Sequence, residues 1–293
     1  MKVMILGVSG FLGHHITKEF QEQGYFVVGV DKRPVPKDHV QPDYFIQADV
    51  KDLIFRDLLG IDFVVSLFWR TNIPDCLRHP LESTYQNIDT TVHILEVARE
   101  AKIKKVFFPS TASLYGHNPV PWTEDMPPDP IDHYSWQKLS CESLCRMYAQ
   151  TFGLNTAVAR FFQIYGEFQR EDTAIAAFLR AKQNGQPITL TETTAQSSFK
   201  SGQRDFIYAG DVAKAVVLLT CGKTEPGGIY NVGSGIIHSM EEIAEAIGGE
   251  IKWIPKREWE VETHLANIAK LKTFGWSPKV SVINWLKQYV KTM

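Results

Sequence analysis

The sequence predicts an α/β fold in which a doubly wound parallel sheet is joined to a smaller α+β domain built from non-contiguous segments. Two observations predict the sheet: short, continuous apolar runs alternate with helical patterns through the first half of the chain, and a glycine-rich turn follows the first run. A third predicts the smaller domain, because the alternation loosens after about residue 160.

The first half supplies the strands and crossover helices. Residues 2–6 predict a strand, 14–23 a helix that Gly24 ends, and 25–30 a strand whose apolar run is too continuous for a sheet exposed on one face. The pattern continues with strands at 62–67 and 105–109 and with helices at 84–102 and 134–152. Strands separated by helices form parallel, right-handed crossovers, hence a doubly wound sheet.

The second half contains fewer clear elements. Helices are predicted at 174–184 and 211–221, a polar loop at 191–203 and a strand at 229–232. A further helix at 240–247 begins with a capping box, in which Ser239 stands at the N-cap and Glu242 follows three residues later.

Composition excludes several classes of protein. The 293 residues carry 31 Lys and Arg against 33 Asp and Glu, a formal net charge of −2, so we expect neither nucleic acid nor a membrane as the main partner. No apolar run is long enough to span a bilayer, and the first residues do not resemble a signal peptide. The four cysteines form no CxxC pair and no zinc-like cluster. These features predict a cytoplasmic protein without a metal site.

The glycine-rich turn is the first motif with a chemical meaning. GVSGFLG at 7–13 lies between a predicted strand and a predicted helix, where glycine allows a pyrophosphate to approach the backbone and the helix N-terminus. Asp31 follows the second strand, 18 residues after the last glycine, and can bind an adenosine ribose, which favours NAD over NADP. Lys32 and Arg33 leave NADP open, because a cation there could bind a 2′-phosphate.

The second motif is Tyr134 and Lys138, a Y-x-x-x-K pair on one face of a predicted helix. A phenol has an ordinary pKa of about 10. A neighbouring ammonium and a bound nicotinamide cation both favour the phenolate, so Tyr134 could serve as a general base. Ser110 and Thr111 follow the strand at 105–109, and parallel sheets bind their ligands beyond such carboxyl ends.

Together these motifs resemble the extended short-chain dehydrogenases/reductases, in particular the NAD-dependent nucleotide-sugar epimerase/dehydratase family. The resemblance runs nearly end to end. Its motifs are, in chain order, GVSGFLG (7–13), ADVKD (48–52), YQNIDTT (85–91), STASLYG (110–116), YSWQK (134–138), RFFQIYG (160–166), RDFIYAGDVA (204–213), YNVGSG (230–235) and FGWSP (274–278).

The resemblance implies roles for individual residues. The catalytic group would be Thr111, which orients the substrate, Tyr134 as acid and base, and Lys138, which tunes Tyr134 and contacts the cofactor ribose. The cofactor-binding set would be Gly7, Gly10, Phe11, Leu12, Gly13, Asp31, Lys32, Asp49, Val50, Leu67, Phe68 and Asn87, together with Tyr134 and Lys138. The substrate-binding set would be Thr111, Gln163, Arg204 and Arg257, of which the arginines suit a diphosphate.

Several positions depart from the family pattern. SLFWRT at 66–71 replaces a stretch of small residues, so Phe68 and Trp69 either add bulk beside the nicotinamide or belong to the core. Gln163 replaces an asparagine that helps to hold the nucleotide, and Glu167 replaces a proline. Asn267 stands in place of an aspartate. The departures concern substrate recognition and leave the acid/base pair intact.

Ala112 and Ser113 narrow the reaction. Dehydratases of this family place Asp-Glu directly after the threonine, so a 4,6-dehydratase is not expected. The leading hypothesis is an NAD-dependent nucleotide-diphosphate-sugar 4-epimerase that acts through a transient 4-keto sugar. The alternatives are an NAD(P)H-dependent keto-sugar reductase and, in a different class, a non-catalytic dinucleotide sensor. The sequence does not decide which nucleotide and sugar are bound.

The resemblance also implies an organisation. Residues 1–165 and 203–234 would form the NAD-binding Rossmann domain, and 166–202 with 235–293 the substrate-binding domain. The helices at 84–102 and 134–152 carry apolar residues on more than one face, and the resemblance implies a homodimer through a four-helix bundle.

Overall fold

The computed structural model describes residues 1–193, 197, 199–255 and 261–293. The chain divides into two compact units. The first unit comprises Met1–Gly116, Pro127–Phe161 and Ala213–Tyr230, and the second comprises His117–Met126, Phe162–Val212 and Asn231–Met293. This division differs from the predicted boundaries chiefly at 117–126 and 203–212, which group with the second unit.

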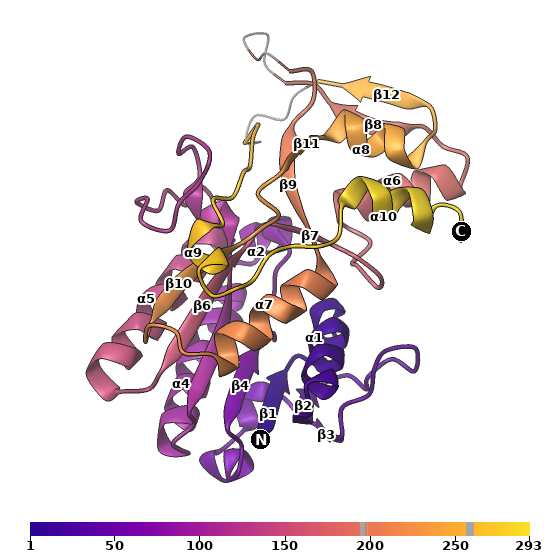
Figure 1. The fold of residues 1–293 in the computed structure, drawn as a ribbon. Coiled ribbons are helices and arrows are strands. Elements are labelled where there is room, and N and C mark those ends of the chain that lie inside the picture. Colours follow the sequence, from indigo (N-terminus) through magenta and orange to yellow (C-terminus); the bar gives the residue numbers. More distant parts are fainter. Residues whose placement is uncertain (194–196, 198, 256–260) are drawn as a thin grey trace. The chain divides into compact units, whose positions relative to one another are not determined.

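A seven-stranded sheet forms the centre of the first unit, in the order β10-β6-β5-β4-β1-β2-β3 (Figure 1). Its strands are β1 (Lys2–Leu6), β2 (Phe26–Asp31), β3 (Tyr44–Gln47), β4 (Phe63–Ser66), β5 (Lys105–Thr111), β6 (Thr156–Phe161) and β10 (Gly228–Val232). Every pairing from β3 across to β6 is parallel. The predicted doubly wound α/β class is confirmed.

Helices connect these strands and cover the sheet. They are α1 (Phe11–Glu22), α4 (Thr90–Glu100), α5 (His133–Phe152) and α7 (Ala209–Cys221), with short 3-10 turns η1 (Val50–Asp52), η2 (Phe55–Leu58) and η4 (Ala112–Tyr115). The strand order runs one way from β1 to β2 and the other way from β4 to β6. Because such crossovers are right-handed, α1 covers one face and α4 and α5 cover the other.

The predicted helix at 84–102 is interrupted in the structure. The chain forms α2 (Ile73–Arg78), α3 (Pro80–Thr84), a π-helical turn η3 (Tyr85–Asp89) and then α4. The wider turn brings Asn87 inward until it is fully buried, and the Thr91 hydroxyl donates to the Asn87 carbonyl at 2.6 Å. Such π turns often lie at functional sites.

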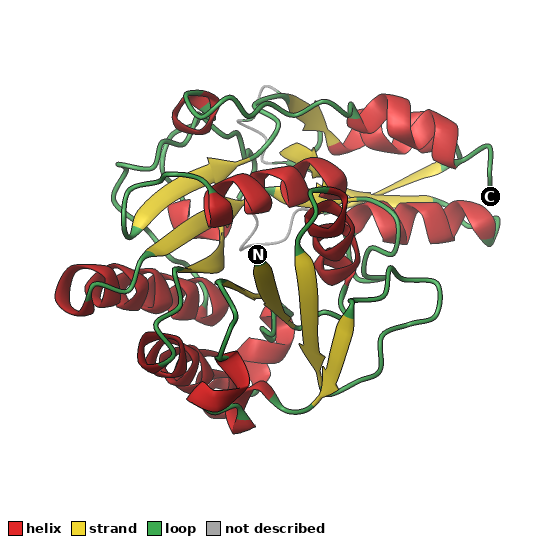
Figure 2. Ribbon diagram, turned by 60° about the horizontal axis from the view of Figure 1, so that its bottom comes forward, coloured by secondary structure: helices red, strands yellow, loops and turns green. Residues whose placement is uncertain are grey.

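The described residues of the second unit form two small sheets and the helices α6, α8, α9 and α10. Figure 2 shows the helices and strands of the whole chain by colour. The sheets have the orders β11-β9-β7 and β12-β8. The elements are β7 (Gln163–Tyr165), α6 (Ala174–Gln183), β8 (Ile188–Thr191), β9 (Gln203–Tyr208), β11 (Ile237–Ser239), α8 (Met240–Ile247), β12 (Ile251–Ile254), α9 (Ala269–Lys272) and α10 (Val282–Tyr289). The predicted capping box is confirmed: the Glu242 amide donates to Ser239 Oγ and the Ser239 amide to Glu242 Oε2, both at 3.0 Å.

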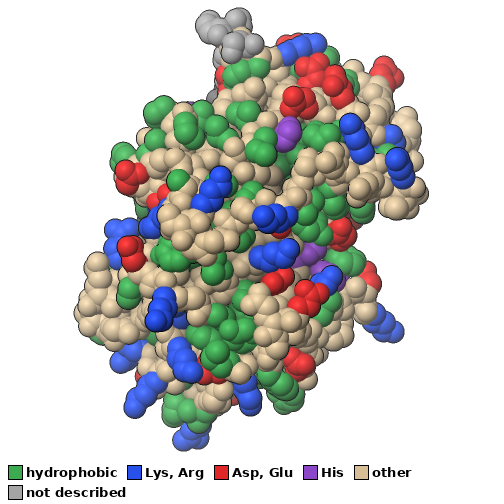
Figure 3. All heavy atoms as spheres, in the orientation of Figure 1, with side chains coloured by type: hydrophobic (Ala, Val, Ile, Leu, Met, Phe, Trp, Pro, Cys, Tyr) green, Lys and Arg blue, Asp and Glu red, His purple; other side chains and the backbone are tan. Residues whose placement is uncertain are grey.

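Side chains of both signs of charge are spread over the face shown in Figure 3, as the small net charge predicts. In the part of the chain that the structure describes, no helix combines the length and the apolar character needed to cross a membrane.

Candidate active site

The glycine turn after β1 is closely packed against its surroundings. Gly7 has φ +87°, and a Cβ on it would lie 2.8 Å from the Leu67 carbonyl carbon. A Cβ on Gly13 would lie 2.1 Å from the Val8 carbonyl oxygen. Gly10 caps α1 without a side chain, and the first turn of α1 has no acidic residue. The backbone amides at this helix start therefore suit an anion such as a pyrophosphate.

Carboxylates offset the cations beside the end of β2. Asp31, 9% exposed, accepts from the Ser9 amide at 3.1 Å and the Arg33 amide at 3.0 Å. Lys32 Nζ lies 2.7 Å from Asp49 Oδ2. Burial raises the pKa of Asp49, but the Lys32 ammonium and the Lys51 amide outweigh that effect and hold this pKa below its usual value. Because Lys32 is paired with a carboxylate, this edge favours ribose hydroxyls over a 2′-phosphate.

The catalytic candidates come together at β5 and α5. Tyr134 lies in the first turn of α5, and Lys138 lies one turn later on the same side, with Nζ 5.8 Å from the Tyr134 ring centroid. Lys138 Nζ donates to the Pro109 carbonyl at 2.6 Å. Two residues further along β5, the Thr111 hydroxyl accepts from the Ser113 amide at 3.2 Å. Tyr134, Lys138 and Thr111 therefore belong to one unit and to two elements in direct contact.

Lys138 is almost fully enclosed, with 2% of its surface exposed. Burial lowers the pKa of its ammonium to about 7, and the acidic groups of Cys141 and Glu142 in the next turn offset part of this effect. At neutral pH the Lys138 side chain is therefore close to its pKa, so the ammonium and the neutral amine are both populated.

Trp69 belongs to the core, which resolves one of the two possibilities for the bulky pair at 68–69. Its side chain is 8% exposed and packs edge-on against Phe108, with ring centroids 5.4 Å apart. Phe68 is partly buried against the same core. The Lys138 ammonium lies 3.7 Å from the Trp69 ring centroid.

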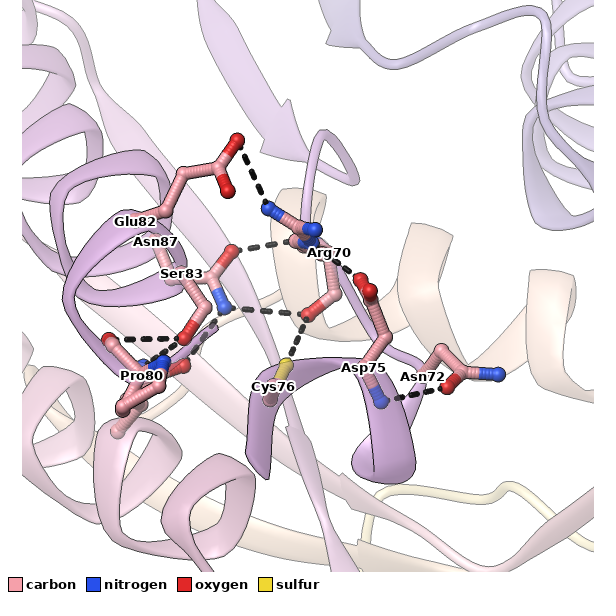
Figure 4. A network of polar contacts seen from close by, with 9 residues as sticks. Arg70, Asn72, Asp75, Cys76, Pro80, Glu82, Ser83 and Asn87 are labelled. Atoms are coloured by element: carbon pink, nitrogen blue, oxygen red, sulfur yellow. Dashed lines mark hydrogen bonds and ion pairs between the residues drawn. The ribbon is translucent and has the colours of Figure 1, made fainter. Parts of the chain in front are cut away.

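Asn87 holds the backbone of the segment that carries Trp69 (Figure 4). Its Oδ1 accepts from the Arg70 amide at 3.0 Å, and its Nδ2 donates to the Arg70 carbonyl at 3.1 Å and to Gln137 Oε1 at 2.7 Å. Both amide hydrogens of Asn87 are thus used inside the protein. These bonds hold the backbone at Arg70. The predicted contact of Asn87 with the cofactor stays a prediction.

The Arg70 side chain forms the outer part of the same network. Its guanidinium pairs with Asp75 and, at 3.3 Å, with Glu82 (Figure 4). The Cys76 thiol donates to the Arg70 carbonyl at 3.6 Å. Sequence reasoning missed this cluster, because its members come from α2, α3 and the loop after β4 and share no motif.

The substrate-binding candidates lie in the second unit. Gln163 begins β7, and Arg204 lies in β9, where Nη1 donates at 2.9 Å to the carbonyls of Gln203 and Glu262. Arg257 lies outside the described residues. His264, which sequence reasoning missed, has its ring 5.0 Å from that of Trp122. Burial, with a smaller contribution from the Arg204 charge, lowers the pKa of His264 to about 3, so the imidazole is neutral at pH 7.

Asp205 connects three segments that are far apart in the sequence. Its carboxylate accepts from the amides of Ser234 at 2.6 Å, Gly235 at 2.9 Å and Ala266 at 3.1 Å. The residue next to Arg204 therefore anchors both the YNVGSG segment and the tail. Glu167 has a similar structural function, because its carboxylate accepts from Tyr208 Oη at 2.8 Å and Trp285 Nε1 at 2.9 Å.

The residues around β1, β4 and β5 fit a dinucleotide. The glycine turn leaves room for a pyrophosphate, and Asp31 lies at the end of β2. Ser110 Oγ, near the carboxyl end of β5, is buried and has no hydrogen-bond partner among the described residues. A buried hydroxyl without a partner is costly unless a ligand or water completes it. The described residues hold no cluster of three or more His, Cys, Asp or Glu that could bind a metal ion.

Comparison with known proteins agrees with this geometry. A model described as the NAD dependent epimerase/dehydratase family matches residues 3–233. A relative from Methanocaldococcus jannaschii, named putative UDP-glucose 4-epimerase, is 28% identical over 317 aligned residues, covering 99% of this chain and 100% of the relative.

Two solved structures are also similar along almost the whole chain. UDP-N-acetylglucosamine 4-epimerase from Methanobrevibacter ruminantium has a TM-score of 0.90 at 26% identity, covering 99% of this chain and 97% of that chain. UDP-glucose 4-epimerase from Thermus thermophilus, in complex with NAD, has a TM-score of 0.88 at 26% identity, covering 99% and 98%. The chain belongs to the NAD dependent epimerase/dehydratase family, whose members are enzymes that use NAD.

Proposed function

We propose that this enzyme is an NAD-dependent 4-epimerase of a nucleotide-diphosphate sugar. The observation that carries the proposal is the arrangement of Tyr134 and Lys138 on one side of α5, bonded through Pro109 to the strand that presents Thr111. Ala112 and Ser113 follow Thr111, where a dehydratase needs an acid and a base. The similarity to UDP-sugar 4-epimerases supports the same reaction and makes UDP-sugars the first substrates to test.

The cofactor would lie along the carboxyl ends of β1, β2 and β4. The amides of Gly10, Phe11, Leu12 and Gly13 would hold its pyrophosphate, and Asp31 its adenosine ribose. Lys32, Asp49 and Val50 would border the adenine, and Leu67, Phe68 and Asn87 the nicotinamide half. Bound NAD supplies a hydride acceptor and, in the return step, a hydride donor.

The protein's own groups would move the proton. The Tyr134 phenolate accepts the proton of the sugar 4-hydroxyl as that carbon is oxidised to a ketone, and returns it after the sugar has turned over. The Thr111 hydroxyl donates to the same oxygen. The Lys138 ammonium lowers the cost of the phenolate and contacts the cofactor ribose. Gln163, Arg204 and Arg257 would bind the nucleotide diphosphate, so we assign substrate recognition to the second unit.

Two experiments test the reaction. The first incubates the enzyme with UDP-, dTDP-, GDP- and CDP-sugars and follows both sugar products and nicotinamide absorbance. An epimerase converts a sugar with no net absorbance change, whereas a keto-sugar reductase consumes NAD(P)H stoichiometrically. Absence of both product and binding across the panel would favour a dinucleotide sensor.

The second experiment replaces the acid and base. Tyr134→Phe should lower kcat by about a hundredfold to ten-thousandfold, because it removes general acid–base catalysis, while bound NAD is retained. Undiminished turnover in this variant would contradict the assignment.

The proposal extends to the setting of the enzyme. All four cysteines are free thiols, which agrees with a reducing, cytoplasmic environment. The exposed face of α5 carries Trp136 and Met147, separated by Ser140 and Ser143, and such an apolar and small-residue face supports a homodimer that packs through α5.

A further inference from the structure

We infer that Trp69 is a positioning residue for Lys138. The face of its indole ring holds the lysine ammonium in place through a cation–π contact. The inference rests on the proposed function for its catalytic consequence, because Lys138 matters to turnover only if Tyr134 is the acid and base. Trp69 itself belongs to none of the glycine, Tyr-Lys or arginine motifs. Trp69 stands within the segment where the sequence departs from its family.

The contact has the geometry of a cation–π interaction. Lys138 Nζ lies 3.7 Å from the Trp69 centroid and 4.8 Å from the Phe108 centroid, and Phe108 packs edge-on against the same indole. Distances below about 6 Å to a ring centroid allow this attraction, and it is strongest when the cation is desolvated. The ammonium also donates to the Pro109 carbonyl at 2.6 Å.

The indole is not held by a hydrogen bond of its own. Trp69 Nε1 is buried and has no partner among the described residues. Burying an N–H without a partner costs free energy that a leucine or phenylalanine would not incur. Packing alone therefore does not account for a tryptophan at this position, whereas the larger and more electron-rich face of indole does.

A buried hydrogen-bond network determines where the Trp69 indole lies relative to Lys138. Asn87 hydrogen-bonds to both the amide and the carbonyl of Arg70 (Figure 4). Its Nδ2 also donates to Gln137 Oε1 at 2.7 Å. Gln137 in turn donates to Ser83 Oγ at 2.9 Å. Arg70 and Gln137 are the chain neighbours of Trp69 and Lys138. Because Asn87 holds Arg70 and Gln137 together, it also holds Trp69 close to Lys138.

Other ionisable groups surround the lysine, and the indole acts alongside them. Those on the packed elements are Cys76 of α2 and Tyr134, Cys141, Glu142 and Cys145 of α5. Glu142 is committed to Arg160 of β6, with Nη2 2.7 Å from Oε2. Burial lowers the pKa of Lys138 to about 7. Because a cation–π contact stabilises the ammonium and not the neutral amine, losing the indole should lower this pKa further.

Tryptophan emission tests the contact without turnover. The emission of Trp69, taken as wild type minus Trp69→Phe, should change with pH with a midpoint near 7 and lose this change in a Lys138→Met background. Trp136 is exposed and stacks on His133, so Trp136→Phe is the matched control and should leave the midpoint unchanged. A Trp69 signal that is independent of pH, or identical in the Lys138→Met background, would overturn the inference.

The pH profile of turnover tests the consequence. Trp69→Leu should move the alkaline limb of kcat/KM about one pH unit lower, as expected for a desolvated cation–π contact, and should therefore lower kcat/KM about fivefold at pH 7. Trp69→Phe should retain most of the wild-type value. The inference would be overturned if Trp69→Leu and Trp69→Phe lost kcat/KM equally and the alkaline limb of the pH profile did not move. If Trp69→Leu does not fold, the emission experiment decides. Failure of the sugar panel and of Tyr134→Phe would overturn the proposed function, and the emission result would stand by itself.

Discussion

A buried lysine is an unusual choice for a structural position, because transferring an ammonium out of water is costly. Lys138 is 2% exposed, and its neighbours satisfy it with one carbonyl and two aromatic faces. The effect of desolvation on the ammonium is larger than the effect of these contacts, so the pKa of Lys138 falls to about 7. At neutral pH a small change in surroundings therefore changes its charge.

This pKa has a consequence for stability. A lysine in an unfolded chain titrates near 10.4, so between about pH 7 and pH 10 the unfolded chain holds a proton that folded Lys138 has released. Stability contributed by this group therefore rises with pH in that window. Relative to Lys138→Met, the wild type should gain about 4 kcal/mol from pH 7 to pH 10, measured by urea unfolding at each pH. A stability difference that does not change with pH would contradict the assigned pKa.

Asp31 is the proposed determinant of the preference for NAD over NADP. Its carboxylate is already oriented by the amides of Ser9 and Arg33, and Lys32 is paired with Asp49. Asp31→Asn removes the charge that a 2′-phosphate would meet, so it should weaken NAD binding about tenfold and reduce the preference over NADP. Titration calorimetry with both cofactors measures this. Asp38→Asn, an exposed carboxylate in the following loop, should leave both affinities unchanged.

Among the elements, those with strong local signals could be predicted from sequence. The capping box of α8 and the Y-x-x-x-K helix α5 form where the residues indicate, and α5 ends at Gly153 with φ 70°. The strands β7, β8, β11 and β12 have three or four residues each and were not predicted, because tertiary pairing rather than periodicity defines them. The π turn at 85–89 was missed because its cause is the inward bonding of Asn87 to Arg70 and Gln137.

The buried hydrogen bonds of Asn87 should stabilise the fold. Asn87→Ala removes the buried partner of the Arg70 amide and of Gln137 Oε1, and it leaves the Arg70 carbonyl with the Cys76 thiol as its donor. It should therefore lower the free energy of unfolding by about 2 to 4 kcal/mol. Asn72→Ala is the matched control. It removes the N-cap of α2, where Asn72 accepts from the Asp75 amide at 2.9 Å, and should cost about 1 kcal/mol. If both variants lost the same free energy of unfolding, the hydrogen bonds of Asn87 would contribute no more to stability than a single helix N-cap.

At the scale of the whole molecule, the sequence predicted the architecture better than the site. Alternation and the handedness of crossovers predict a parallel, doubly wound sheet, and the structure contains one. The site depends on distant pairs such as Trp69 with Lys138, or Asp205 with Ala266, which no local spacing indicates. The net charge of −2 is equally uninformative about Arg204, because a few local cations can bind a diphosphate in a protein that is nearly neutral in total.

The proposed homodimer would pack through the exposed face of α5. Trp136, 47% exposed, and Met147, 36% exposed, lie on the face of α5 that points away from the sheet, with Ser140 and Ser143 between them. Trp136→Glu places a charge in the centre of that face. It should therefore convert a dimer into a monomer in light scattering coupled to size exclusion, because burying an unpaired carboxylate costs several kcal/mol. Tyr44→Glu, on the edge strand β3 at the opposite end of the sheet, should leave the mass unchanged. A wild type that is monomeric at micromolar concentration, or a Trp136→Glu variant that stays dimeric, would rule out pairing through α5.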